Sequence, residues 1–88
     1  MKFTRKITSI YDKLEQLIEE MEEHLNELEE KYDKLNNKLN ELDEDEDKKA
    51  YRKLEKQIEK LNEQMEEVEE AKGEVENSRD YLADYTNY

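Results

Sequence analysis

Residues 39–54 read LNELDEDEDKKAYRKL, and this stretch decides how the chain folds. On either side of it, apolar residues recur at alternating spacings of three and four, the heptad pattern of helices that pack on other helices. Nine residues separate Leu42 from Tyr51, so the heptad phase breaks between them. The eight residues in the gap, 43–50, include five consecutive acids. The stretch therefore predicts a polar turn.

The heptad columns on both sides of the turn are long and nearly continuous. The columns before it hold Ile7, Tyr11, Leu14, Ile18, Met21, Leu25, Leu28, Tyr32, Leu35, Leu39 and Leu42. The columns after it hold Tyr51, Leu54, Ile58, Leu61, Met65, Val68, Lys72, Val75, Arg79 and Leu82. Strong helix formers such as Glu, Lys, Leu and Gln fill most other positions. With 33% hydrophobic and 48% charged residues, the chain suits a long helical system and not a large globular core.

Two helical arms of similar length, joined by a short polar link, favour an antiparallel pair. The predicted fold is all-α, an antiparallel helical hairpin or coiled coil within a single helical domain. Its predicted bounds are arm 1 at about 5–42, the turn at 43–50, arm 2 at about 48–87 and the domain at 1–88. Each arm should be roughly 50 Å long, at ~1.5 Å per residue. The alternative is one continuous helix in a long parallel dimer.

The ends of the second arm carry two further predictions. Asp45 or Asp47 is expected to cap its start, because Asp is a poor helix former and a good N-cap. Gly73 leaves two alternatives. It ends the helix, with a short third helix at about 78–87, or the helix tolerates it. The heptad phase from Val68 to Val75 favours a continuous helix.

Acidic residues are concentrated in two segments that a hairpin would bring together. Residues 15–30 hold eight acids and no Lys or Arg, and residues 61–78 hold seven acids and one base. Between them, residues 31–60 hold nine acids and nine bases. We call the predicted interaction surface the acidic belt, made of Glu15, Glu19, Glu20, Glu22, Glu23, Glu27, Glu30, Glu63, Glu66, Glu67, Glu70 and Glu74. The alternative is a solvated face, although like charges at i, i+4 spacing cost helix stability.

The open end of the hairpin is predicted to expose apolar side chains. The second arm places Lys72 and Arg79 in core columns there, while the first arm adds apolar residues beyond its columns. A two-helix hairpin cannot cover them all, and Tyr is favoured at interfaces. The predicted apolar interface is Ile10, Leu14, Leu17, Tyr81, Leu82, Tyr85 and Tyr88. Self-association into a dimeric four-helix bundle is expected to cover it; a different protein partner is the alternative.

The residues that could support catalysis are few and scattered. His24 is the only histidine, Ser9 and Ser78 are the only serines, and Cys is absent. His24 shares a helical face with Glu20 and Glu27, but a di-iron bundle site needs Glu-x-x-His on two helices. Neither a P-loop nor an EF-hand spacing occurs. The sequence therefore predicts that the protein is not an enzyme and binds no cofactor or metal.

Net charge and hydropathy also indicate in which compartment the chain acts and which surfaces it avoids. The net charge is −12, so nucleic acid and anionic membrane surfaces repel it. Apolar runs do not exceed three residues, too few to cross a bilayer. We therefore expect a cytoplasmic protein with no direct nucleic-acid or membrane binding.

Three functions fit these features. The first is a non-enzymatic helical protein that docks on a protein partner with a basic surface, as an adaptor or inhibitor. The second is a nucleic-acid mimic that blocks a nucleic-acid-binding enzyme, in the way of small acidic phage proteins that block restriction or CRISPR enzymes. The third is a structural coiled-coil spacer or scaffold.

Overall fold

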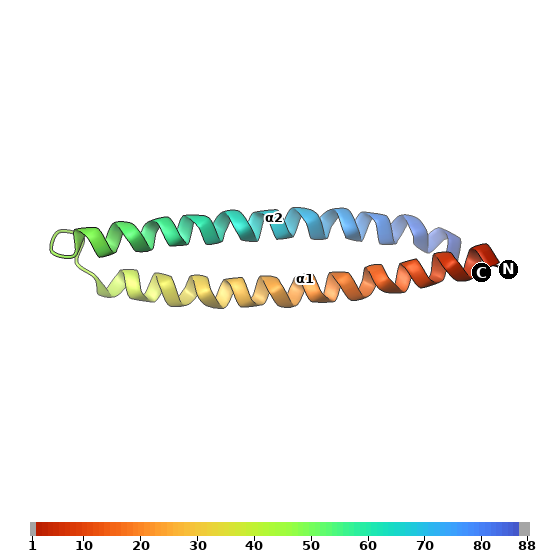
Figure 1. Ribbon diagram of the computed structural model, residues 1–88, viewed down its shortest axis with the longest axis horizontal. Helices are drawn as coiled ribbons and strands as arrows, with labels where there is room; N and C mark the ends of the chain where they lie inside the picture. The colour runs from red at the N-terminus through yellow and green to blue at the C-terminus, as the bar shows by residue number, and fades with distance from the viewer. Residues whose placement is uncertain (1, 87–88) are drawn as a thin grey trace.

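The computed structural model describes residues 2–86, and the side chains of residues 5–85. It contains two α-helices, α1 (Lys2–Glu41) and α2 (Lys48–Thr86), which lie side by side and antiparallel (Figure 1). The molecule is a rod of 69 × 15 × 14 Å. A single continuous helix of this chain would be about 130 Å long at 1.5 Å per residue. The predicted hairpin is therefore confirmed, and α1 begins slightly before the predicted bound.

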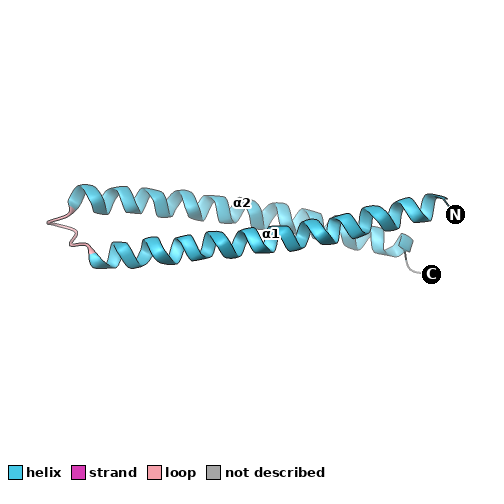
Figure 2. Ribbon diagram, turned by 60° about the horizontal axis from the view of Figure 1, so that its bottom comes forward, coloured by secondary structure: helices cyan, strands magenta, loops and turns pink. Residues whose placement is uncertain are grey.

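The predicted heptad columns form the seam between the helices. Each column residue from Ile7 to Leu82 is buried or half-buried, and Ile18, Leu25, Leu28 and Leu61 are the most buried, at 4–9% exposure. Figure 2 shows the helices crossing toward the open end, as expected when a heptad repeat drives supercoiling. Because only two helices pack together, most of each helix surface faces outward and is available for binding.

The turn is held by aspartate side chains bonded to its own backbone. Asp43 Oδ1 accepts hydrogen bonds from the N–H groups of Asp45 (2.9 Å) and Glu46 (3.4 Å). Asp47 Oδ2 accepts one from the Asp43 N–H (3.3 Å). The Asp47 carbonyl accepts from the Tyr51 N–H at 2.8 Å, the first bond of a helix that begins at Lys48. Asp47, one of the two predicted residues, thus occupies the N-cap position.

Helix α2 runs without interruption through Gly73. The glycine has no positive φ, and a methyl group added to it would meet nothing within 4 Å. The alternative of a short third helix at 78–87 is therefore wrong. The residues on either side keep their hydrogen-bonded helical turns and their packing on α1, so one glycine costs less than ending the helix.

Candidate functional site

The seam divides the surface of the rod into two flanks of different chemistry. In an antiparallel pair, the heptad g positions of both helices border one flank and the e positions border the other. We call the flank bordered by the g positions neutral. In the half of the rod next to the chain ends, the open half, its g positions hold Ile10, Leu17, His24, Ala71, Ser78 and Tyr85. We call the flank bordered by the e positions acidic, because its e positions in the same half include Glu15, Glu22, Glu29, Glu69 and Glu76.

Two basic residues from the core column of α2 reach onto the acidic flank. Lys72 Nζ lies 3.3 Å from a Glu22 carboxylate oxygen and 3.6 Å from one of Glu76. Arg79 lies 3.9 Å from Glu15 and 3.1 Å from Asp80. A long aliphatic stem lets such a residue sit beside an apolar seam while its charge stays at the surface.

These ion pairs are consistent with the register of the hairpin, and they shift the pKa of the basic groups. If the heptads are matched outward from Leu42 and Tyr51 on either side of the turn, Lys72 lies opposite Met21, and the observed partner Glu22 adjoins Met21. The hydrogen bond with Glu22 raises the pKa of Lys72. The hydrogen bond with Asp80 raises the pKa of Arg79. Each pair strengthens the charged form of its base, since the neighbouring carboxylates outweigh partial burial.

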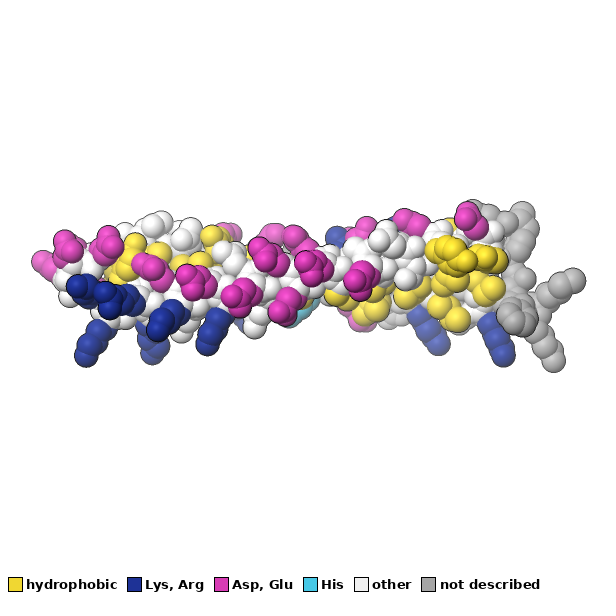
Figure 3. Space-filling view, turned by 90° about the horizontal axis from the view of Figure 1, so that it is seen from above, with side chains coloured by type: hydrophobic (Ala, Val, Ile, Leu, Met, Phe, Trp, Pro, Cys, Tyr) yellow, Lys and Arg dark blue, Asp and Glu magenta, His cyan; other side chains and the backbone are white. Residues whose placement is uncertain are grey.

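All twelve residues of the acidic belt are exposed. The belt extends over both helices along the same length of the rod, and Figure 3 shows its acidic side chains following α2. Among the described residues, interhelical ion pairs engage two members of the belt, Glu15 and Glu22. Sequence reasoning omitted Glu29, Glu69 and Glu76 from this surface, although their shared e position was a signal that could have included them.

The open end carries the exposed large hydrophobic residues of the described chain, visible as the yellow cluster in Figure 3. They are Ile10, Leu17, Tyr81 and Tyr85, at 48%, 39%, 66% and 48% exposure, and we call them the apolar patch. Leu14 and Leu82, also predicted for this interface, are half-buried in the seam. Tyr88 lies outside the described residues.

The two tyrosines of the apolar patch contact each other on one face of α2. Their ring centroids are 5.7 Å apart at an interplanar angle of 48°, and their hydroxyl oxygens are 3.4 Å apart. This hydrogen bond raises the pKa of Tyr85. On α1, a hydrogen bond with the Glu15 carboxylate similarly raises the pKa of Tyr11. The Tyr85 and Tyr11 phenols therefore stay neutral well above physiological pH, and tyrosines such as these present apolar rings with polar tips.

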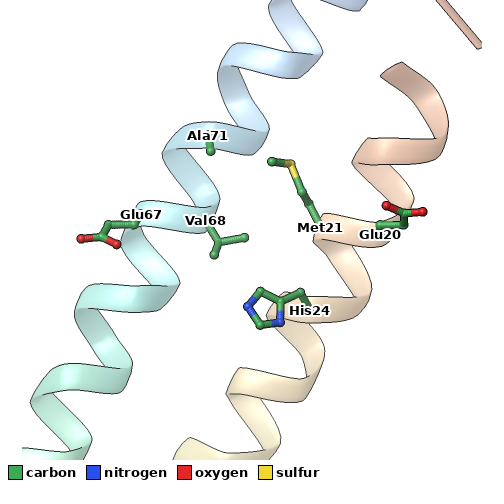
Figure 4. A pocket seen from close by; sticks show the side chains of 6 residues that line it. All are labelled: Glu20, Met21, His24, Glu67, Val68 and Ala71. Atoms are coloured by element: carbon green, nitrogen blue, oxygen red, sulfur yellow. The ribbon is translucent and has the colours of Figure 1, made fainter. Parts of the chain in front are cut away.

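A shallow groove lies on the neutral flank. Its lining residues are Glu20, Met21, His24, Glu67, Val68 and Ala71 (Figure 4). Met21, His24 and Val68 point between the helices, while the carboxylates of Glu20 and Glu67 point outward. His24 Nδ1 lies 3.9 Å from a Glu27 oxygen, and both side chains are mostly exposed. Across residues 2–86, no three His or acidic side chains converge in a way that could hold a metal ion.

Comparison of the chain with protein-family models, with curated proteins and with solved structures finds no match. Neither α1 nor α2, over the residues that the structure describes, has a stretch both long and apolar enough to cross a membrane. The surface chemistry of the hairpin is thus the basis for a functional proposal.

Proposed function

We propose that this chain is a non-enzymatic docking protein that binds a partner with a basic surface through its acidic belt, as an adaptor or inhibitor. One observation carries the proposal. The belt is exposed along two rigid helices, in segments that hold fifteen acids and one base. Like-charged neighbours such as Glu19 and Glu23 oppose helix formation, so helix stability alone does not account for this surface. An opposite charge on a partner offsets that cost and speeds association.

The charge density of the belt favours one class of basic partner. Residues 15–30 and 61–78 lie side by side, because ion pairs join Glu22 to Lys72 and Glu15 to Arg79. The longer segment spans about 27 Å at 1.5 Å per residue. Together they carry about one net negative charge per 2 Å of rod, and double-stranded DNA carries one per ≈ 1.7 Å. This match supports the second candidate function, mimicry of nucleic acid toward a protein that binds it.

The belt can be tested by charge reversal with a matched control. Replacing Glu19, Glu23, Glu66 and Glu70 by Lys should reduce partner capture from a host lysate steeply, because it converts attraction into repulsion. Circular dichroism should show helicity unchanged or higher, since the reversals relieve like-charge pairs. The control replaces Glu41, Glu44, Glu55 and Glu59, exposed residues of the balanced half, by Lys. It makes the same change in net charge and should reduce capture much less.

A competition experiment with nucleic acid distinguishes nucleic-acid mimicry from other ways of docking on the partner. Duplex DNA or RNA should displace this protein from the captured partner if the belt occupies a nucleic-acid site. A partner that holds both at undiminished affinity would exclude mimicry and leave general docking in place. If both sets of reversals capture the partner like the unmodified protein, the docking proposal itself is wrong and the belt is a solvated face of a structural spacer.

A further inference from the structure

The apolar patch is part of the neutral flank and not of the acidic belt. Ile10 and Leu17 are one heptad apart, so they align along α1 beside the seam. Tyr85 holds the equivalent position on α2, and Tyr81 borders the same flank in a shallow hollow with Ser78 and Leu82. These four large apolar side chains are 39–66% exposed, and such a group of exposed apolar residues favours contact with another surface.

We propose that the apolar patch binds a second copy of this chain, with the two hairpins antiparallel and overlapping only by their open halves. In this arrangement Ile10 of each copy packs against Leu17 of the other, about a two-fold axis near the level of Lys13. The tyrosines of the two copies meet on the α2 side. A two-fold interface uses the same patch twice, so the patch must be complementary to itself.

The charges that border the patch favour this antiparallel overlap. The c positions of α1 run from basic at the open end (Lys6, Lys13) to acidic in the middle (Glu20, Glu27), and to basic again at Lys34. An overlap about Lys13 places Lys6 of each copy opposite Glu20 of the other, which makes two attractive pairs. It makes one repulsive pair, between the two Lys13 side chains. Opposite charges across an interface determine its orientation.

The competing full-length arrangement is unfavourable on the same grounds. A two-fold parallel dimer in register would place α1 of each copy opposite α2 of the other. At matching levels Glu20 would then face Glu74, Glu27 would face Glu67 and Lys34 would face Lys60, which are all like charges. Such juxtaposition is strongly unfavourable across an interface.

The exposed area of the patch suits the centre of a small interface. At 150–250 Å² for a tyrosine, the exposed fractions of Tyr81 and Tyr85 offer roughly 200 Å² per copy. A standard interface buries about 800 Å² per partner, so the bordering g and c residues must supply the rim. This dimer leaves most of the acidic belt free, because the e, b and f positions that carry eight of its twelve residues face away from the neutral flank.

Cysteine cross-linking tests the arrangement, because the natural chain has no cysteine. Lys13→Cys lies near the proposed axis and should form a disulfide-linked dimer under mild oxidation. Gln16→Cys lies at the same level on the outer face, and Lys34→Cys lies on the neutral flank near the turn. Both should cross-link at least several-fold more slowly. A Lys34→Cys rate equal to that of Lys13→Cys, or no cross-linking in any variant, would overturn the proposal.

Mass and shape give a second test on the chain without cysteine. The mass should double from 10.8 kDa as concentration rises, and small-angle scattering should give a dimer of about 100 Å, because only the open halves overlap. Leu17→Glu should restore the monomer mass while circular dichroism shows helicity retained, since Leu17 is 39% exposed. A persistent monomer would show that the patch does not bind a second copy, and a dimer of unchanged 69 Å length would show overlap along the whole rod. Either result would overturn the dimer that overlaps only by its open halves.

Discussion

At the scale of single residues, Lys72 shows how a charge is accommodated in a heptad column. Its side chain is 23% exposed, and its ammonium group bridges Glu22 on α1 and Glu76 on α2. An apolar residue there would extend the seam toward the open end. The lysine instead neutralises part of the acidic flank, whose e positions among the described residues of that half hold no base.

The Lys72 bridge predicts a reversal that can be rescued. Lys72→Glu would bring three carboxylates together, so the thermal midpoint measured by circular dichroism should fall clearly. The double variant with Glu22→Lys restores one opposite pair across the seam and should recover part of the loss. Lys56→Glu, an exposed residue on α2, makes the same charge change away from the seam and is the control. If Lys72→Glu melts at the same temperature as Lys56→Glu, the bridge contributes nothing to stability.

At the scale of the elements, α2 is the helix whose integrity depends on its partner. Its core columns contain Lys72 and Arg79, and Gly73 lies between them in a helix of 39 residues. By contrast, α1 has an unbroken apolar column from Ile7 to Leu42. Since an isolated helix gains little from propensity alone, packing on α1 keeps α2 continuous at its weakest point.

Gly73 therefore predicts a stabilising substitution. The helical backbone and the open space around its Cα allow Gly73→Ala without strain. The change should stabilise the hairpin by about 0.5–1 kcal/mol, because alanine loses less backbone entropy in a helix. The thermal midpoint should rise by about 2–8 °C for a chain of this size. A lower midpoint would indicate that the helix breaks at this glycine in solution.

At the scale of the whole molecule, the two candidate surfaces share the open half of the rod but face different directions. The acidic belt covers mainly the outer faces and the acidic flank, and the apolar patch lies on the neutral flank (Figure 3). A second copy on the neutral flank would leave both acidic flanks outward. Two belts on one rigid dimer would let a partner with two basic sites bind more tightly than one belt allows.

Salt should affect binding through the acidic belt and binding through the apolar patch differently. Exposed charges are screened beyond ~8 Å at physiological ionic strength, so raising salt from about 0.05 to about 0.5 M should weaken partner binding several-fold. Association through the apolar patch relies on hydrophobic burial and should change little over this range. Surface plasmon resonance for the partner and sedimentation for the dimer measure the two effects. If salt does not change partner binding, the partner binds an apolar surface of this protein and not the acidic belt.

The sequence by itself determined the hairpin, the seam and the turn, because heptad spacing and its phase break are periodic properties of the chain. It also determined which residues are acidic and which lie outside the apolar columns, so the residues of the belt and the patch could be named. Their roles remain proposals. The tertiary structure alone decided that α2 continues through Gly73, since that choice depends on packing against α1. Only the tertiary structure shows that the Lys72 and Arg79 side chains lie on one flank, because their partners Glu22 and Glu15 belong to a helix that is distant in sequence.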